Sequence, residues 1–255
     1  MSTTLIAQPA RLPSLYSTET YSLCQAQTPA DLEEVQRLRF RVFNLELKEG
    51  LESAYQTGRD ADAFDWVCDH LMVIHKPSQK VVGTYRMQTG VSAAAHRGYY
   101  SAQEFNFAPF EKFRLEIVEL GRACVEKPHR SVSVLNLLWR GIARYARERG
   151  GRYLIGCSSL TSQDAALGRA MFESLASEHL ASPEWRTSPL PALRLPPSEG
   201  FAETPYPPRL FAAYLGLGAK ICGEPALDRE FQTIDFLTVL DLKGLHSAAR
   251  RYLSP

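Results

Sequence analysis

Residues 116–140 combine residue types that could do chemistry with a pattern that would place them at a cleft. The segment EIVELGRACVEKPHRSVSVLNLLWR predicts a strand, a turn and the start of a helix. Glu119 and Arg122 interrupt the apolar run of the strand. Burying either charge without a partner costs on the order of several kcal/mol. We therefore expect this strand to face a cleft or to pair the two charges.

The turn after this strand is a candidate binding site for an anion. It contains Pro128, His129 and Arg130, and a helix is expected to begin at about Ser131 or Ser133. A helix N-terminus presents unpaired N–H groups and the positive end of the helix dipole, which suit an anion such as a phosphate.

The spacing of Glu119 and Arg122 sets a geometric condition. Alternation along a strand places residues three apart on opposite faces of the sheet. Both side chains can reach one substrate only if the strand bends or bulges, and Gly121 is the natural position for a bulge. Otherwise only one of the two side chains contacts the substrate, and the other acts through it.

The composition favours a single ordinary globular domain. The chain has 255 residues, of which 45% are hydrophobic, and its net charge of +1 disfavours a nucleic-acid partner. It has no apolar run of about 18 residues, and its N-terminus lacks the pattern of a secretory signal. The five scattered cysteines form no CxxC pair, and His129 has no second histidine at ligand spacing. We expect a reduced, cytoplasmic location and no metal site.

The expected elements mix strands and helices irregularly. Strands are expected at residues 21–26, 71–75, 80–89, 115–125, 152–157, 219–222 and 233–241. Helices are expected at residues 30–43, 133–149, 163–177 and 208–217. This order predicts an α/β (α+β) fold with a mixed sheet and helices on both faces.

One domain is expected over residues 20–245, between a flexible lead-in (1–19) and a C-terminal tail (246–255). Within the domain, residues 183–208 are too rich in proline for regular structure. This segment is expected to be a lid, a binding loop or a surface insertion.

Four short motifs resemble those of the acyl-homoserine-lactone synthases. They are Arg39-Phe-Arg-Val-Phe43, Asp62-Ala-Phe-Asp65 with Asp69 after it, Gly83-Thr-Tyr-Arg86 and Glu119-Leu-Gly-Arg122. Those enzymes are GNAT-like N-acyltransferases that take acyl chains from acyl carrier protein. They also carry an aromatic residue several positions after the Phe at Phe43. Residues 47–51 of this chain lack it, which disfavours lactone formation.

Longer segments resemble the ornithine-lipid N-acyltransferases, the hemolysin-like branch of the same superfamily. They are FDWVCDHLMV (64–73), VVGTYRMQ (81–88), ELGRACVEKPHRS (119–131), LLWRGIARY (137–145), YLIGCSS (153–159) and residues 214–242. The resemblance covers roughly residues 20–245. It implies a GNAT-like acyl-CoA N-acyltransferase fold with a central twisted sheet. The implied activity moves a long, often 3-hydroxylated acyl group from acyl carrier protein to the α-amino group of ornithine, giving a lyso-ornithine lipid.

The resemblance also implies roles for individual residues. Glu119 would accept the amine proton, directly or through water, and Arg122 or the strand backbone would stabilise the oxyanion. The residues implied in substrate handling are Arg39, Phe43, Asp62, Asp65, Asp69 and Arg86. Among these, the aspartates would bind the ornithine ammonium, and the arginines its carboxylate. Two structural alternatives stay open. In the first, the aspartates cap turns, and in the second, the arginines form structural ion pairs with these same aspartates.

The expected donor site differs from the usual GNAT motif. Arg130, Ser131 and Ser133 are implied to hold the phosphopantetheine, but Ser133 and Leu135 replace both glycines of R-x-x-G-x-G. Because glycine lets backbone approach a phosphate closely, tight coenzyme A binding is disfavoured. The replacement favours the single phosphate of acyl carrier protein. No tightly bound cofactor is expected.

A basic series around the following helix is either a solvated face or a docking surface for the acidic carrier protein or for anionic lipid of the inner membrane. Its members are Lys127, Arg130, Arg140, Arg144, Arg147, Arg149 and Arg152.

Three rival functions stay open. The first is an N-acyl amino acid synthase with another acceptor, or a lactone-forming enzyme. The second is a non-catalytic module that binds acyl carrier protein. The third, a membrane-lytic protein, is disfavoured because the sequence has no long amphipathic or apolar segment.

Overall fold

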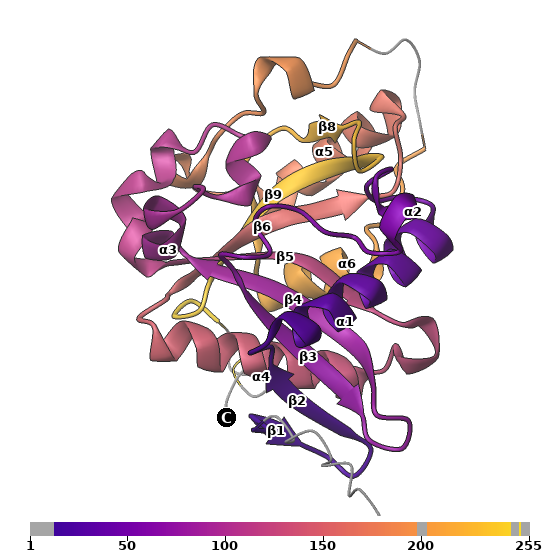
Figure 1. Cartoon of the computed structure of the whole chain (residues 1–255). Coiled ribbons are helices and arrows are strands. Elements are labelled where there is room, and N and C mark those ends of the chain that lie inside the picture. Colours follow the sequence, from indigo (N-terminus) through magenta and orange to yellow (C-terminus); the bar gives the residue numbers. More distant parts are fainter. Residues whose placement is uncertain (1–12, 198–202, 246–249, 251–255) are drawn as a thin grey trace, which may run out of the picture.

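A nine-stranded mixed sheet forms the centre of the molecule (Figure 1). The computed structural model describes residues 13–197, 203–245 and 250. The strands lie in the order β1-β2-β3-β4-β5-β6-β9-β7, and β8 also pairs with β9. They are β1 (Tyr16–Ser17), β2 (Tyr21–Gln25), β3 (Asp69–His75), β4 (Lys80–Thr89), β5 (Ile117–Val125), β6 (Tyr153–Leu160), β7 (Lys220–Ile221), β8 (Ala226–Asp228) and β9 (Thr233–Asp241). The expected mixed sheet is confirmed. Because β1 already pairs with β2, the sheet begins inside the segment expected to be a lead-in.

The longer helices begin and end where capping residues stand. They are α1 (Pro29–Phe40), α4 (Val132–Glu148), α5 (Ala165–His179) and α6 (Arg209–Leu217). In α1 the Thr28 hydroxyl and the Asp31 carboxylate form a capping box. In α4 the Ser131 hydroxyl accepts from the Val134 N–H, and Gly150 follows the last turn at a positive φ of 72°. The helices expected from the sequence are confirmed to within a few residues.

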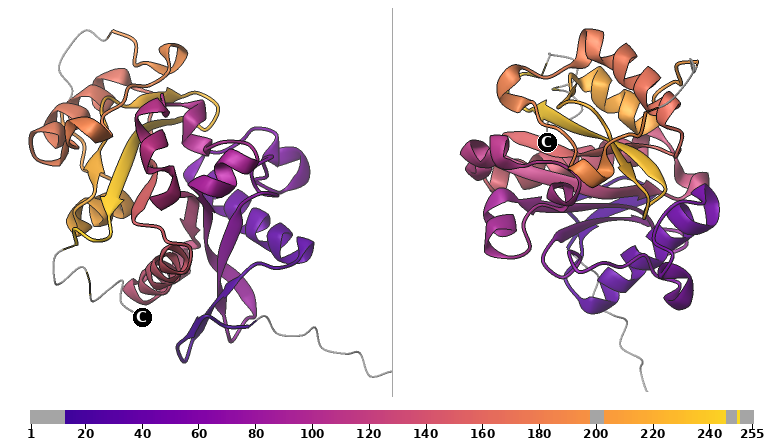
Figure 2. Two further views of the ribbon diagram at one scale, coloured as in Figure 1. Left: turned by 90° about the vertical axis from the view of Figure 1, so that its left-hand side faces the viewer. Right: turned by 90° about the horizontal axis from the view of Figure 1, so that it is seen from above.

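Helices α1 and α4 cover opposite faces of the sheet, as Figures 1 and 2 show. Alternation along β3 divides its side chains between two clusters. Leu71 and Val73 pack in the cluster under α4, whereas Met72 packs in the cluster under α1. Figure 2 also shows the N-terminal and C-terminal segments on opposite sides of the middle strands. Helices on both faces are therefore confirmed.

Strands β5 and β6 are parallel neighbours that separate after three pairs of residues. The pairs are Ile117 with Tyr153, Val118 with Leu154 and Glu119 with Ile155. Just beyond them, a Cβ added at Gly156 would lie 2.2 Å from the Leu120 carbonyl oxygen, so only glycine fits there. Farther along, β6 pairs only with β9 and β5 only with β4. The sheet opens at this point.

A β-bulge on β5 lies next to the opening. Thr84 pairs with Cys124 and Arg86 with Gly121, so two residues of β5 oppose one residue of β4. Arg122 takes the unusual left-handed conformation, with φ of 48°. The expected bulge is confirmed, and the positive φ falls on Arg122 itself.

Short helical segments connect the longer elements of the described chain. They are α2 (Ala54–Thr57), α3 (Gly90–Ala95), the π-helical turn η1 (Arg41–Leu47) and the 3-10 helices η2 (Tyr100–Gln103), η3 (Ala108–Glu116), η4 (Lys127–His129), η5 (Pro183–Trp185) and η6 (Pro191–Leu193). Phe105, Phe107 and Phe110 are buried, and Phe110 stacks on Trp185 at 5.6 Å. These rings are part of the packed core. The tail expected at residues 246–255 lies, apart from residue 250, outside the described residues.

Candidate active site

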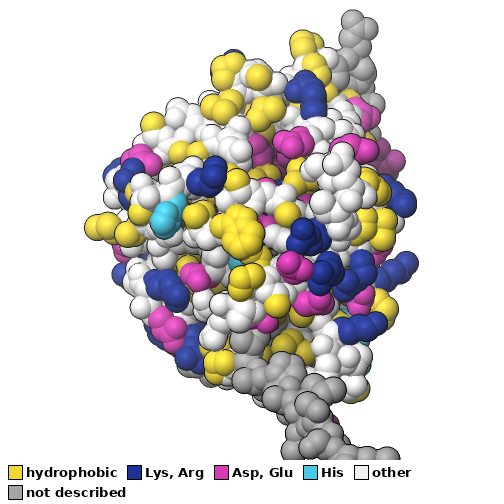
Figure 3. Space-filling model, in the orientation of Figure 1, with side chains coloured by type: hydrophobic (Ala, Val, Ile, Leu, Met, Phe, Trp, Pro, Cys, Tyr) yellow, Lys and Arg dark blue, Asp and Glu magenta, His cyan; other side chains and the backbone are white. Residues whose placement is uncertain are grey.

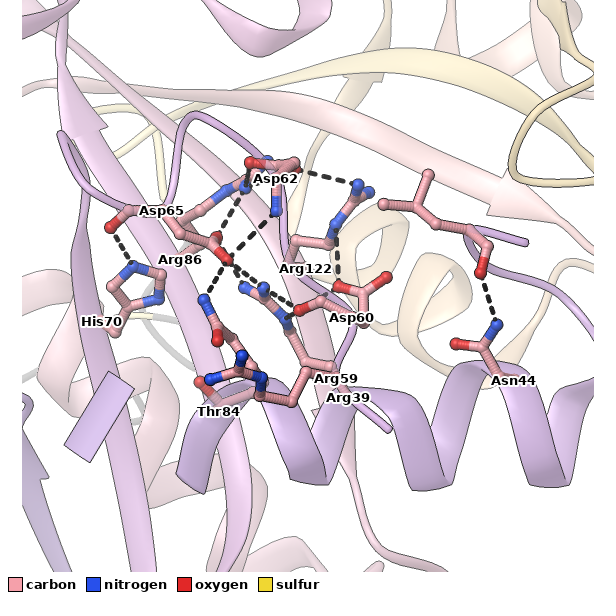
Figure 4. A network of polar contacts seen from close by, with 12 residues as sticks. Arg39, Asn44, Arg59, Asp60, Asp62, Asp65, His70, Thr84, Arg86 and Arg122 are labelled. Carbon is pink, nitrogen blue, oxygen red and sulfur yellow. Dashed lines mark hydrogen bonds and ion pairs between the residues drawn. The ribbon is translucent and has the colours of Figure 1, made fainter. Parts of the chain in front are cut away.

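Three arginines and three aspartates form a buried, charge-balanced network (Figure 4). Arg39 comes from α1, Arg86 from β4 and Arg122 from the bulge of β5. Asp60, Asp62 and Asp65 come from the loop before β3. The side chains of Arg39, Asp60 and Asp65 are fully buried, and Asp62 is 16% exposed. The network therefore meets solvent at Asp62.

Each carboxylate in the network already has guanidinium partners. Arg39 Nε lies 2.9 Å from Asp60 Oδ1, and Arg39 Nη1 donates to Asp65 Oδ1 at 2.9 Å. Arg86 Nη1 donates to both oxygens of Asp62, at 2.6 and 2.7 Å, and to Asp65 at 2.9 Å. Arg122 Nη2 donates to Asp62 at 3.0 Å. These contacts hold the loop of residues 60–65 over β4 and β5.

The network gives structural contacts to several residues that were predicted to bind substrate. Because Asp62 and Asp65 are neutralised by arginines, they do not offer the free carboxylates expected for an ammonium. Arg39 has no exposed surface and is paired with Asp60 and Asp65, which disfavours its predicted contact with a substrate carboxylate. Arg86 is 3% exposed and also serves the aspartates, although it lines a pocket described below. The alternative of structural ion pairs is the one the contacts support.

Two other predicted substrate residues lie apart from the network. Phe43 is buried in the core against Phe231, with ring centroids 5.3 Å apart. Asp69 accepts from Gln25 at 2.7 Å and from Tyr145 of α4 at 2.8 Å. Since α4 covers the opposite face of the sheet from α1, the structure does not bring Asp69 together with Asp62 and Asp65.

The network also shifts the pKa values of its members. Burial alone would raise the pKa of Asp65, but Arg39, its hydrogen bonds and Arg86 outweigh burial and hold that pKa well below its usual range. The pKa of Asp62 is lowered in the same way, with burial opposed by Arg86 and Arg122. Burial and the nearby Arg39 lower the pKa of His70 to about 4. Its Nε2 lies 3.0 Å from the Asp65 carbonyl oxygen.

The pKa of His70 predicts part of the acid sensitivity of the fold. Between about pH 6.5 and pH 4 the unfolded chain binds a proton at His70 and the folded chain does not, so stability falls as the pH falls. We expect His70 to contribute roughly 2–3 kcal/mol to this loss. Urea unfolding at pH 7 and pH 4.5 should show a smaller difference for His70→Gln, whose amide can still donate to the Asp65 carbonyl. Equal differences in both proteins would contradict the assignment.

Glu119 anchors a turn of backbone. Its Oε2 accepts from Tyr100 N at 2.8 Å and Gln88 Nε2 at 2.6 Å, and its Oε1 accepts from Ser101 N at 2.8 Å. The carboxylate thereby fixes the first residues of η2. Tyr100 in turn accepts from Arg122 Nη1 at 3.2 Å through its hydroxyl. The structure thus brings Glu119 and Arg122 to the same turn, as the bulge hypothesis requires. The role of Glu119 as base stays a prediction.

A small pocket opens at the bulge. It is lined by Cys68, Arg86, Met87, Gln88, Tyr100, Glu119, Leu120 and Gly121. Glu119 therefore contacts the backbone of η2 and also lines this pocket.

The predicted phosphopantetheine residues lie at the N-terminus of α4. Arg130 pairs with Glu46 at 2.6 Å and donates to the Val125 carbonyl at 2.9 Å. The Ser131 hydroxyl caps the helix, and Ser133 is exposed. The helix start expected from the sequence is confirmed, and its binding role stays a prediction.

Many members of the basic series have acidic partners. Arg144 pairs with Glu148 at 2.7 Å, Arg149 with Asp69 at 3.6 Å and Arg152 with Asp241 at 2.7 Å. On the face drawn in Figure 3, Lys and Arg side chains stand among Asp and Glu side chains. These pairs weaken the local positive field, and the docking role stays a prediction.

Sequence reasoning missed several polar residues that complete the site. Asp60, Gln88 and Tyr100 hold Arg39, Glu119 and Arg122 through the contacts above. It also missed Glu104 and Asp235, which are buried beside Cys157. Asp235 interrupts an apolar strand, which is the same signal that singled out Glu119. Among the described residues, Glu104, Cys157 and Asp235 are the group whose spacing could also suit a metal ion.

The fold and site define the class of the protein. A mixed sheet that opens between two parallel strands, with a bulge and a pocket at the opening, is the architecture of a GNAT-type N-acyltransferase. The acetyltransferase (GNAT) domain family matches residues 38–140. The structure of FeeM, an N-acyl amino acid synthase from uncultured soil microbes, shares the fold with a TM-score of 0.53 at 11% identity. That match covers 91% of this chain and 97% of FeeM. The AHL synthase LasI gives a TM-score of 0.52 at 12% identity, covering 92% of this chain and 93% of LasI.

Sequence relatives specify the family. The L-ornithine N(alpha)-acyltransferase of Brucella abortus (strain 2308) is 34% identical over 247 residues, covering 90% of this chain and 86% of the relative. The enzyme of the same name from Agrobacterium fabrum is 34% identical over 249 residues, covering 90% and 82%. The chain belongs to the L-ornithine N(alpha)-acyltransferase family, and the resemblance inferred from its motifs is confirmed.

Over the part of the chain that the structure describes, none of the helices has the length and apolar character needed to cross a membrane.

Proposed function

We propose that this enzyme acylates the α-amino group of ornithine with a long-chain, 3-hydroxylated acyl group and so forms a lyso-ornithine lipid. The donor is the phosphopantetheine thioester of acyl carrier protein. The observation that carries the proposal is the pocket at the β5 bulge, beside the opening of the sheet, in a chain whose relatives are named for ornithine acylation. We place the reaction in the cytoplasm, where the carrier protein delivers its chain, with peripheral contact to the inner membrane for release of a lipid product.

The geometry suits attack of an amine on a thioester. As the amine adds and the C–N bond forms, the carbonyl oxygen gains negative charge, which N–H groups at the bulge can stabilise where the ladder is interrupted. The C–S bond then breaks as the carbonyl re-forms. A free α-amino group needs only modest help to lose its proton. Glu119 lines the pocket and is the proposed acceptor of that proton, directly or through water. The proton then passes to the leaving thiolate.

The donor half of the proposal rests on the start of α4. Arg130, Ser131 and Ser133 would receive the phosphopantetheine phosphate, with Arg130 exchanging its ion pair to Glu46 for the phosphate. Ser133 and Leu135 stand where glycines would let a pyrophosphate approach. We therefore expect carrier-bound acyl groups to react faster than coenzyme A thioesters.

The test is direct turnover. The purified protein is incubated with 3-hydroxyacyl carrier protein and with a panel of ornithine, lysine, glutamine, glycine and tyrosine, and the products are identified by mass spectrometry. We expect an amide on the α-nitrogen of ornithine, with kcat/KM at least about 10-fold above the other acceptors, a preference worth about 1.4 kcal/mol.

Two controls separate the parts of the proposal. The same acyl group on coenzyme A tests the donor preference, and equal rates would overturn the inference from Ser133 and Leu135. Absence of an amide with every acceptor and both donors would contradict the enzymatic function.

A further inference from the structure

A second cluster of buried acidic groups lies on the other side of the opening in the sheet. Glu104 ends η2 and is 5% exposed, and Asp235 of β9 is 4% exposed. Cys157 of β6 lies beside them, and one ligand atom from each of the three residues lies within 4.8 Å of the others. Cys157 Sγ donates to Glu104 Oε2 at 3.7 Å.

Unlike the arginine network, this cluster lacks a compensating cation. Among residues 13–197, 203–245 and 250, no Lys, Arg or His forms an ion pair with Glu104 or Asp235. Asp235 Oδ1 is buried without a well-formed hydrogen bond among these residues. Its Oδ2 accepts from Thr233 at 3.3 Å, and the side chains of Ser159 and Glu104 also interact with its carboxyl group. A buried carboxylate oxygen with no donor is costly unless a ligand supplies one.

The surroundings add further negative charge. Burial raises the pKa of Asp235 to about 6, and the neighbouring Asp228 adds to the effect. Burial, Asp235 and Asp228 raise the pKa of Glu104 well above its usual range. Glu49, which accepts from Thr161 at 2.8 Å, also faces Asp235 and has a pKa raised mainly by burial. Without a cation, these groups must hold protons that they would otherwise release.

The cluster adjoins the candidate active site. Glu104 directly follows η2, whose first residues bind Glu119 and whose Tyr100 lines the pocket. Cys157 stands two residues beyond Ile155, the last residue of β6 that pairs with β5. The acidic groups thus lie on the β6 and β9 side of the opening, and the pocket lies on the β4 and β5 side.

We propose that Glu104 and Asp235 bind the side-chain ammonium of the diamino acid acceptor and set the preference for it. An ammonium group has three donors and one positive charge, which satisfy Asp235 Oδ1 and balance the carboxylates. This inference rests on the proposed function. It replaces Asp62 and Asp65, whose charges the arginines already balance, as the ammonium site. A neutral acceptor would leave the acidic groups unpaired, so a site built this way selects against it.

A divalent metal is a different occupant and fits less well. Metal ligation requires the Cys157 thiolate, whereas burial and the nearby Glu104 raise the pKa of this thiol well above its usual range. The cluster therefore holds a thiol that donates to Glu104.

The experiment compares ornithine with norvaline, which has the same carbon chain without the side-chain ammonium. Wild type, Asp235→Asn, Glu104→Gln and the exposed control Glu230→Gln are assayed with one 3-hydroxyacyl carrier protein. For Asp235→Asn and Glu104→Gln we expect kcat/KM for ornithine to fall about 30- to 100-fold, mainly through KM, and norvaline turnover to stay within about 3-fold. Glu230→Gln should leave both substrates unchanged.

The Tm distinguishes a binding role of these acids from a structural role, because loss of a structural contact would lower it. Because each substitution removes a buried acid that has no cationic partner, the Tm of Asp235→Asn and Glu104→Gln should stay level or rise. A lower Tm together with equal losses on both substrates would overturn the proposal, as would an unchanged ornithine to norvaline ratio.

Calorimetric binding without any acyl donor separates this inference from the proposed function. Wild type should bind ornithine at least about 30-fold more tightly than norvaline, and Asp235→Asn should lose that difference. If no amino acid is acylated but this binding pattern holds, the proposed function fails and the ammonium site stands. A stoichiometric divalent ion in the purified protein, lost with Asp235→Asn, would overturn the ammonium site.

Discussion

Replacing Arg39 with methionine is expected to lower the free energy of unfolding by about 3–5 kcal/mol. Arg39 is fully buried and pairs with Asp60 and Asp65, which are also fully buried. Without the guanidinium, two carboxylates would stay in the interior with one positive charge fewer than they need. The remaining arginines serve Asp62 as well, so they cannot replace it. Urea unfolding at pH 7, followed by far-UV circular dichroism, measures the change.

Arg37 supplies the matched control on the same helix. Its side chain is 47% exposed and pairs with Glu33 and Glu34 one turn away. Exposed pairs of this kind contribute little, so Arg37→Met should change the stability by less than about 0.5 kcal/mol. If Arg39→Met cost less than about 1 kcal/mol, the network would not be the element that holds the loop of residues 60–65, and the assignment of these aspartates as structural would be wrong.

Replacing Glu119 with glutamine is expected to lower kcat/KM by about 100-fold or more, equivalent to about 2.7 kcal/mol. The carboxylate accepts from two backbone N–H groups of η2 and from Gln88. An amide in its place turns one acceptor into a donor and leaves at least one buried N–H unpaired, at about 1–3 kcal/mol for each such group. The start of η2 should then loosen, and Tyr100 and Glu104 with it.

The pH dependence of turnover separates anchoring from proton transfer. If Glu119 mainly anchors η2, the variant keeps the shape of the kcat/KM profile against pH and shows a lower Tm with faster proteolysis near residues 97–104. If Glu119 is also the base, the acidic limb of the profile changes in addition. Glu111→Gln, an exposed acid paired with Arg114, is the control and should leave rate and Tm unchanged. Full activity in Glu119→Gln would exclude both roles.

The sequence predicted the elements that build the site because their signals are local. Apolar periodicity and capping residues gave α1, α4, β5 and β9 nearly within their observed limits. The charge of Glu119 inside an apolar strand pointed to a special strand, and the spacing to Arg122 required the bulge that the structure contains. Asp235 in β9 is also a charge inside an apolar strand, but no second charge lies near it in the sequence to suggest a partner.

By itself, the sequence determined the fold class, the family and the residue types of the site. Hydrophobic periodicity, helix-capping residues and long sequence motifs depend only on neighbouring residues. Only the tertiary structure decided which charges neutralise one another. Arg39 meets Asp60 and Asp65 across 21 and 26 positions, and Arg122 meets Asp62 across 60. Ion pairing in the interior depends on distance and burial, which the chain order does not encode locally. For that reason Asp62 and Asp65, which were predicted to bind ammonium, proved to be balanced by arginines. The acids without a cationic partner were Glu104, directly after η2, and Asp235 of β9.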